Sequence, residues 1–105
     1  MELTISAPGM DLTGDDRDRI AKSLEKIDRR LKDYDLVYGE VRISGNDNAA
    51  PVRKVTLEIE YGRHHLVAKA EHGDAGQALR QARDEIIRQI NDGKARGGHS
   101  DYAKR

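Results

Sequence analysis

The spacing of apolar residues changes period several times along this chain, and this change restricts the fold more than any other feature. In a strand, apolar and polar residues alternate because successive side chains point to opposite faces, whereas on a helix apolar residues recur every three or four positions. Residues 2–7 alternate, residues 13–33 recur at helical spacing, three further segments alternate, and residues 74–91 return to helical spacing. The sequence therefore predicts strand, helix, three strands, helix.

The three consecutive strands should form hairpins in one sheet. They are expected at residues 37–44, 54–60 and 65–71. The polar segment 45–51, which contains glycine and proline, favours a loop, and Gly62-Arg63 favours a tight hairpin turn. Each strand has one aliphatic face and one charged or polar face, so we expect the sheet to be covered on one side only.

Each predicted helix carries a single apolar stripe. The stripe residues are Ile20, Leu24, Ile27 and Leu31 on the first helix, and Ala75, Ala78, Leu79, Ala82, Ile86 and Ile90 on the second. Thr13 and Asp74 are suited to N-cap positions, and Gly93 is suited to end the second helix. Both stripes must lie against the apolar side of the sheet, which predicts a two-layer α+β domain of βαβββα order.

Composition limits what this domain can contain. The chain has 105 residues, 36% of them hydrophobic, with no Trp, Phe or Cys. A chain of this length holds one modest aliphatic core, which leaves little room for a deep substrate cavity. We expect one domain over residues 1–93 and a flexible basic tail over residues 94–105.

The sequence contains no pattern typical of an active site. It lacks a phosphate-binding glycine loop, a dinucleotide fingerprint and a glycine-flanked nucleophile. His64 and His65 are adjacent in a predicted strand, so their side chains should point to opposite faces and cannot share one metal ion. We therefore expect a protein that is not an enzyme and has no cofactor, metal site or small-molecule substrate.

Neither a membrane segment nor a secretion signal is apparent. The apolar runs are a few residues long, and the first residues combine no basic patch with an apolar stretch. A cytoplasmic protein without membrane contact is the expectation.

Several short segments, taken in order, resemble one known family. These segments are Leu3-Thr4-Ile5-Ser6, Leu12-Thr13, residues 21–27 (AKSLEKI), residues 66–71 (LVAKAE) and Gly73-Asp74. Together they resemble the ribosome hibernation-promoting factor family, also described as ribosome-associated inhibitors or sigma-54 modulation proteins. The resemblance covers residues 1 to about 95.

The resemblance implies a fold and a partner. The family fold is βαβββα and resembles double-stranded RNA-binding domains. Its members bind ribosomal RNA of the small subunit between head and body, over the messenger and transfer RNA sites, and so block initiation and preserve idle ribosomes. Contacts are implied for basic residues on the outer faces of the two helices.

The second helix departs from the family pattern. Residues 75–77 (AGQ) stand where relatives often have an aromatic residue, and Asp84, Glu85 and Asp92 make this helix more acidic. The additional C-terminal domain of the long family members is absent. The chain thus corresponds either to a short form or to the N-terminal part of a longer one.

Cations on the outer face of the first helix are the leading candidates for RNA binding. With the apolar stripe turned inward, Lys22, Lys26 and Arg29 lie opposite it and Arg30 flanks them. Long cationic side chains one turn apart can follow a phosphate backbone. The alternative is a solvated face on which the two lysines pair with carboxylates at helical spacing. Those carboxylates are Asp18, Glu25 and Asp33.

The second helix supplies the remaining candidates. Arg80 and Arg88 lie on or beside its outer face, and Lys94 and Arg96 extend the basic patch beyond its expected end. Arg80 is four residues from Asp84 and could pair with it instead. Tyr34 and Tyr38 could stack on bases or pack against neighbouring side chains.

The formal net charge of +0 leaves a second function open. A dedicated nucleic-acid binder is usually basic, so RNA binding must rest on how the charges are distributed. A protein-interaction module that uses the mixed-charge sheet face, with weak or no RNA binding, is the alternative. A continuous positive stripe over both helices favours RNA, and a patchwork of charge favours a protein partner.

Overall fold

The computed structural model describes residues 1–46 and 52–97, with only the backbone described at Asn46 and residues 94–97. Within these ranges the chain forms four strands and three helical segments. In chain order they are β1 (Glu2–Ser6), α1 (Gly14–Ser23), α2 (Glu25–Arg30), β2 (Val37–Asn46), β3 (Val52–Tyr61), β4 (His64–His72) and α3 (Ala75–Gly97). The predicted βαβββα order is confirmed, with α1 and α2 in the place of the first helix.

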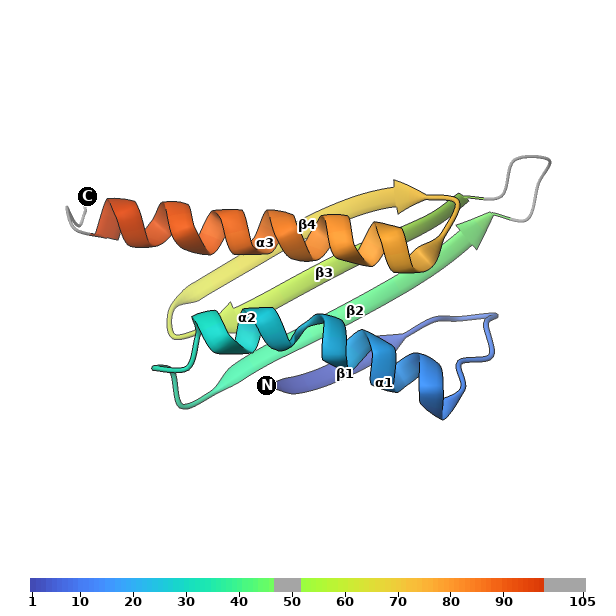
Figure 1. Ribbon diagram of the computed structural model, residues 1–105, viewed down its shortest axis with the longest axis horizontal. Helices are drawn as coiled ribbons and strands as arrows, with labels where there is room; N and C mark the ends of the chain where they lie inside the picture. The colour runs from blue at the N-terminus through green and yellow to red at the C-terminus, as the bar shows by residue number, and fades with distance from the viewer. Residues whose placement is uncertain (47–51, 98–105) are drawn as a thin grey trace.

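The four strands form one mixed sheet in the order β1-β2-β3-β4. β1 runs parallel to β2, and the β2–β3 and β3–β4 pairs are antiparallel. All three helical segments lie on one face of the sheet, with α1 and α2 beside α3 (Figure 1). The predicted two-layer α+β architecture with one open sheet face is therefore confirmed.

The core lies between the sheet and the helices and is almost entirely aliphatic. The helical stripes predicted from the sequence are buried in it except for Ala75, which is half-buried, and Leu24, Ile27 and Ile86 are at most 1% exposed. Among the described residues no polar or charged side chain is buried. Burying an aliphatic side chain of this size stabilises a fold by roughly 1.5–3 kcal/mol, so these stripes determine which way each helix faces.

The first helix is interrupted, contrary to the continuous helix predicted to about residue 33. The interruption is at Leu24, whose backbone N–H lies 3.2 Å from the carbonyl oxygens of both Ile20 and Ala21. Such sharing of one N–H tightens a turn toward 3₁₀ geometry. Leu24 keeps right-handed dihedrals (φ −89°, ψ −2°), so α2 continues in nearly the same direction and its stripe stays inward.

The second helix continues past Gly93 to Gly97, so the predicted end near residue 91 is wrong. Gly93 does not take the left-handed conformation by which a glycine ends a helix, which among described glycines only Gly9 and Gly62 adopt. A helical glycine costs about 1 kcal/mol relative to alanine, and the lysine, alanine and arginine that follow favour helix.

The loops and turns agree with the prediction apart from their limits. Gly62 has φ +56° in the two-residue turn between β3 and β4, as expected for this hairpin. Gly45 and Asn46 belong to β2 rather than to the predicted loop, and residues 47–51 lie outside the described residues. At the outer strand, the Gln89 side-chain nitrogen of α3 donates to the Val67 carbonyl oxygen of β4 over 3.2 Å.

Candidate nucleic-acid interface

Both helices of the outer layer start at side-chain caps. Thr13 and Asp16 form a capping box: the Asp16 N–H donates to the Thr13 hydroxyl over 3.1 Å, and the Thr13 N–H donates to the Asp16 carboxylate over 3.0 Å. The latter bond chiefly holds the pKa of Asp16 below its usual value. The Asp74 carboxylate accepts from the Gly76 N–H over 2.9 Å at the start of α3. Caps of this kind stabilise a helix by about 1 kcal/mol each. They determine the residue at which each helix begins, and therefore the direction in which its cationic side chains point.

Lys22, Lys26 and Arg29 are exposed on the side of α1 and α2 that faces away from the sheet. Within the described part of the chain, neither lysine has an ion pair. The pairing with Asp18, Asp33 or Glu25 that the sequence left open is not formed there. Glu25 instead lies 3.8 Å from Arg29, with both side chains more than half exposed. A pair at this distance and exposure contributes little, so most of the positive charge on this face is uncompensated within the described residues.

The predicted cations of α2 line a groove against α3. Lys26, Arg29 and Arg30 form one wall of a hollow of about 320 Å³, and Asp84 and Ile87 form the other. The Arg30 guanidinium also reaches the Asn91 side-chain oxygen over 3.3 Å, which ties α2 to α3. The basic surface of α2 therefore extends from its outer side to the side that faces α3.

Arg83 is a residue that the sequence analysis did not select. Its side chain is 13% exposed, pairs with Asp84 at 2.9 Å and donates to the Ser23 hydroxyl over 3.3 Å. This arrangement links α3 to α1 and compensates the Asp84 charge at the groove. Arg83 follows Ala82 and Leu79 at the border of the apolar stripe, and that spacing was the signal for a residue facing the other helix.

Arg80 is exposed and has no ion pair within residues 1–46 and 52–97. The Arg80–Asp84 pair considered from the sequence does not form, because Asp84 bonds to Arg83. Positions 80, 84, 87 and 91 fall on one flank of a helix. Since Asp84, Ile87 and Asn91 meet α2, Arg80 belongs to the flank of α3 that borders α1 and α2.

Arg88 lies in a different setting from the other candidates. Its guanidinium bonds to Asp92 over 2.6 Å and to Glu85 over 2.5 Å. Hydrogen bonds from Arg88, and then from Gln89, lower the pKa of Glu85 to about 2, and Glu85 in turn raises the pKa of Arg88. Two carboxylates thus neutralise the outer cation of the far flank of α3, and a phosphate would have to displace them.

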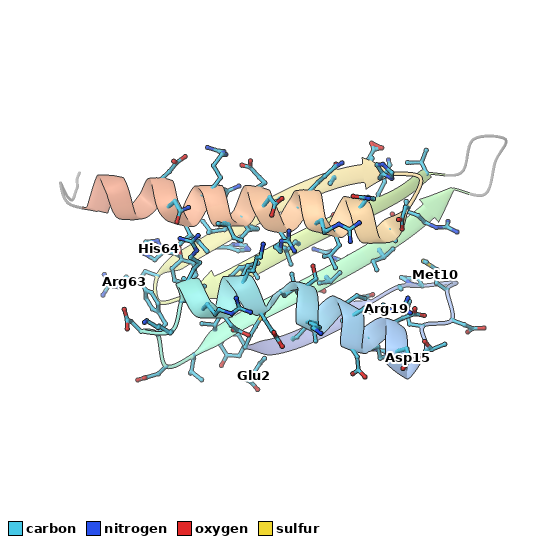
Figure 2. All side chains as sticks on the ribbon, viewed as in Figure 1. Glu2, Met10, Asp15, Arg19, Arg63 and His64 are labelled. Carbon is cyan, nitrogen blue, oxygen red and sulfur yellow. The ribbon has the colours of Figure 1, made fainter. Side chains whose placement is uncertain are left out.

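Further residues complete or limit the cationic surface. Arg19 is exposed on α1, labelled in Figure 2, and precedes Lys22 and Lys26 by three and seven residues. This spacing places it on the same helical side, which the sequence pattern already contained. The side chains of Lys94 and Arg96 lie outside the described residues, so their role stays a prediction.

The two predicted aromatic candidates differ in their surroundings. The Tyr34 ring packs edge-on against Tyr61 with 4.8 Å between centroids, so it is engaged within the chain. Tyr38 is 46% exposed on the open face of the sheet, away from the helices. Neither tyrosine lines the groove between α2 and α3.

Other kinds of site find no support in the described residues. His64 stacks on Tyr61 and His65 lies 2.9 Å from Glu58, so the two imidazoles have separate partners. Within the described ranges no group of three or more potential metal ligands occurs. No helix of the same ranges combines the length and the apolar character needed to cross a bilayer.

Two solved structures share this fold. The N-terminal domain of Protein Y from Thermus thermophilus superposes with a TM-score of 0.75 at 18% identity, covering 88% of this chain and 98% of that domain. A ribosomal subunit interface protein from Coxiella burnetii superposes with a TM-score of 0.70 at 18% identity, covering 90% of this chain and 99% of the other. At this identity the likeness establishes the fold alone. No curated protein sequence matches the chain.

The family assignment comes from the sequence model described as sigma 54 modulation protein / S30EA ribosomal protein, which matches residues 3–97. This match runs from Leu3 in β1 to Gly97, the last described residue of α3. It confirms the resemblance drawn from the short sequence segments. The chain belongs to the sigma 54 modulation protein / S30EA ribosomal protein family.

Proposed function

We propose that this protein binds ribosomal RNA of the small subunit through the cations that border the groove between its two helices. Bound over the messenger and transfer RNA sites, it would exclude both ligands sterically and keep the ribosome dormant. Family membership supports a ribosomal partner, because the family consists of ribosome-binding regulators rather than enzymes. A cytoplasmic location follows from this partner and is part of the proposal.

The observation that carries the proposal is the set of exposed cations around the groove. Lys22 and Lys26 on one side and Arg80 on the other lack ion pairs in the described chain, and Arg29 has only a long, exposed one. A phosphate backbone laid along this groove could be contacted from both helices. We therefore assign the leading role to these residues with Arg30, and a lesser one to Arg88.

A net charge of +0 is compatible with RNA binding because the two layers differ in charge: α1, α2 and α3 contain 11 Lys or Arg and 8 Asp or Glu, whereas the four strands contain 4 Lys or Arg and 5 Asp or Glu. Four glutamates (Glu2, Glu40, Glu58 and Glu60) line a hollow on the open sheet face, on the opposite side from the helices. The sheet separates these charges from the groove. Electrostatic attraction to RNA is then local to one face, and the protein would bind in one orientation.

The direct test is co-sedimentation with purified small subunits. We expect a Lys22→Glu, Lys26→Glu, Arg29→Glu triple variant to lose about a hundredfold or more in affinity, since three attractive phosphate contacts become repulsive. The matched control carries three reversals away from the groove, Arg17→Glu, Lys32→Glu and Arg63→Glu, all at exposed positions. Equal pelleting of the triple variant and the wild type would remove the proposed interface.

Salt dependence tests the mechanism separately from the residues. If four to six phosphates are neutralised, affinity should fall by about two to three powers of ten between about 50 and about 200 mM salt. Binding that ignores salt would exclude a phosphate-based interface. The mixed-charge open face, the alternative raised by the sequence, would then become the leading site for ribosome contact.

A further inference from the structure

The open face of the sheet has its charges divided between its two ends. The strand register arranges the outward residues in four successive rows across the strands. The rows are Glu2, Tyr38, Glu60 and His65; Thr4, Glu40, Glu58 and Val67; Ser6, Arg42, Thr56 and Lys69; and Ser44, Lys54 and Glu71. Two rows at one end hold most of the acidic residues, namely Glu2, Glu40, Glu58 and Glu60. The other two rows hold Arg42, Lys54 and Lys69 together with one glutamate, Glu71. The face is therefore acidic at one end and mainly basic at the other.

The acidic end can be located in the molecule. Glu2 and the hairpin residues Arg63 and His64 lie at one end of the sheet, and Met10 lies at the other (Figure 2). A hollow near the first end is lined by the four glutamates and Tyr38, and a second hollow is lined by Arg42, Lys69 and their neighbours. No helix among residues 1–46 and 52–97 covers this face (Figure 1).

The charges in the middle of the face are paired within the chain, whereas Glu60 and Lys54 toward its two ends are not paired within the described residues. Arg42 bonds to Glu58 and lies 3.8 Å from Glu40. The imidazole of His65 lies 2.9 Å from Glu58, and its hydrogen bond chiefly holds the pKa of Glu58 below its usual value. Glu60 and Lys54, in the first and last rows, are exposed and form no ion pair within the described residues.

We propose that this face is an interface between two copies of the chain, stacked open face to open face with their strands antiparallel. A twofold axis in the interface, perpendicular to the strands, places each strand over its own counterpart and reverses the order of the rows. The first row of one copy then faces the fourth row of the other, and the second row faces the third. Glu60 of each copy faces Lys54 of the other, and Glu40 faces Arg42.

Other arrangements of the two faces are less favourable. A twofold axis along the strands would place the acidic end of one copy on the acidic end of the other, and like charges across an interface are repulsive. The antiparallel arrangement also sets His65 of one copy opposite Glu71 of the other. Strands of packed sheets cross at about 30°, so these partners meet approximately rather than in perfect alignment.

The size of the face indicates a weak dimer. Four strands about 4.8 Å apart and four rows about 6.7 Å apart give roughly 500 Å² per copy. A stable interface usually buries about 800 Å² per partner. Tyr38 and Val67, which are 46% and 40% exposed, supply the apolar part of the contact. The dimer should therefore form at high protein concentration and depend on salt.

Sedimentation velocity of the full chain tests the association. At about 50 mM salt we expect dimers to appear as the protein rises from about 10 µM to about 1 mM, and to dissociate again at about 500 mM salt, where surface charges are screened. A chain that stays monomeric across this range would overturn the proposal. Dimers that are unaffected by salt would overturn the charge-based interface.

A charge exchange at two positions tests the antiparallel arrangement. Glu60→Lys and Lys54→Glu should each weaken dimerisation by about tenfold or more, because each creates two repulsive contacts. The double variant should dimerise again, since the same two contacts become attractive with reversed sign. The two positions are six residues apart on β3, about 20 Å, so they cannot compensate each other within one chain. A double variant that remains monomeric would overturn the arrangement.

A heterodimer test and a control variant check that the effect comes from the contacts between copies. A one-to-one mixture of the two single variants should form heterodimers, because both cross-copy contacts are then attractive, and their absence counts against the proposal. Lys32→Glu, directly after α2 in the helical layer, is the matched control and should dimerise as the wild type does. Loss of dimers in this control would place the contact on the helices and overturn the open-face interface.

Discussion

The two parts of the helical layer resemble each other in sequence pattern but differ in the state of their charges. Both α1–α2 and α3 bury one aliphatic stripe on the same sheet, and both carry arginine or lysine on the outside. On the first, Lys22 and Lys26 stand without ion pairs in the described chain, whereas on α3 Arg88 is held by Glu85 and Asp92. A count of cations on a helix therefore does not measure the positive charge available to a phosphate.

This difference assigns the two helices different tasks. α3 is the longest helix described, contacts β3 and β4, and bonds to α1, α2 and β4 through Arg83, Asn91 and Gln89. The first helix holds more of the exposed cations. We expect changes in α3 to act mainly on stability and changes in α1 and α2 mainly on RNA binding. Four experiments can sharpen or break this division.

The largest effect is expected from the core side of α3. Ile86 is 0% exposed beneath the helix, and Ile86→Ala should lower the free energy of unfolding by about 3 kcal/mol through lost burial and the cavity left behind. Urea denaturation measures this change. A loss below about 1 kcal/mol would mean that α3 is docked less firmly than its burial indicates.

Single neutralisations on the two helices compare their cations directly. Lys26→Gln should weaken binding to small subunits about threefold to tenfold and lower the salt slope by about 0.9, as expected when one phosphate contact is lost. Arg88→Gln should weaken binding less than Lys26→Gln does and leave the salt slope nearly unchanged, because Arg88 already bonds to Glu85 and Asp92. Equal effects of the two substitutions would end the distinction between the helices.

Arg83 should affect both stability and RNA binding. Arg83→Met keeps much of the side-chain volume but removes the bonds to Ser23 and Asp84. Stability should fall by about 1 kcal/mol. RNA affinity should also fall severalfold, because the Asp84 charge at the groove is then uncompensated. Combined urea denaturation and co-sedimentation would show both changes, and an unchanged affinity would mean that Asp84 lies away from the bound RNA.

The smallest effect concerns the pH dependence of α3. The pKa of Glu85 is lowered to about 2 in the folded chain, from its usual value of 4.5. Its contribution to stability is therefore present above the unfolded pKa and is lost as the pH falls from about 4.5 toward 2. In the Glu85→Gln variant, the free energy of unfolding should fall less steeply with decreasing pH than in the wild type. The difference should be small because the Glu85–Arg88 pair is solvent-exposed. Identical pH dependence of the two proteins would show that the pair contributes nothing.

The sequence was sufficient for the features that depend on period and burial. Ile27 and Ile86 could be placed in the core because aliphatic spacing follows directly from helix geometry. Gly93 was misjudged, since a glycine can end a helix or lie within one, and the choice depends on the residues after it. The interruption at Leu24 carries no distinctive residue and could not have been anticipated.

The candidate site was harder to predict than the fold. Lys22, Lys26 and Arg29 lie outward as the helical wheel indicated. The pairing of Arg88 depends on which of several carboxylates within reach is taken, and Arg83 shows that a neighbour can claim a carboxylate first. Such competition is decided by side-chain geometry between elements, which a one-dimensional pattern does not contain.

The bond from Gln89 to the Val67 carbonyl has a consequence for how copies of this protein avoid aggregating. β4 is a terminal strand of the sheet, and the carbonyl that Gln89 occupies points away from β3, where a foreign strand would otherwise attach. Natural sheets usually block such borders against amyloid-like extension. By occupying one acceptor in the middle of the strand, α3 interrupts the ladder that an incoming strand would need, and growth of the sheet by strand addition is hindered on that side.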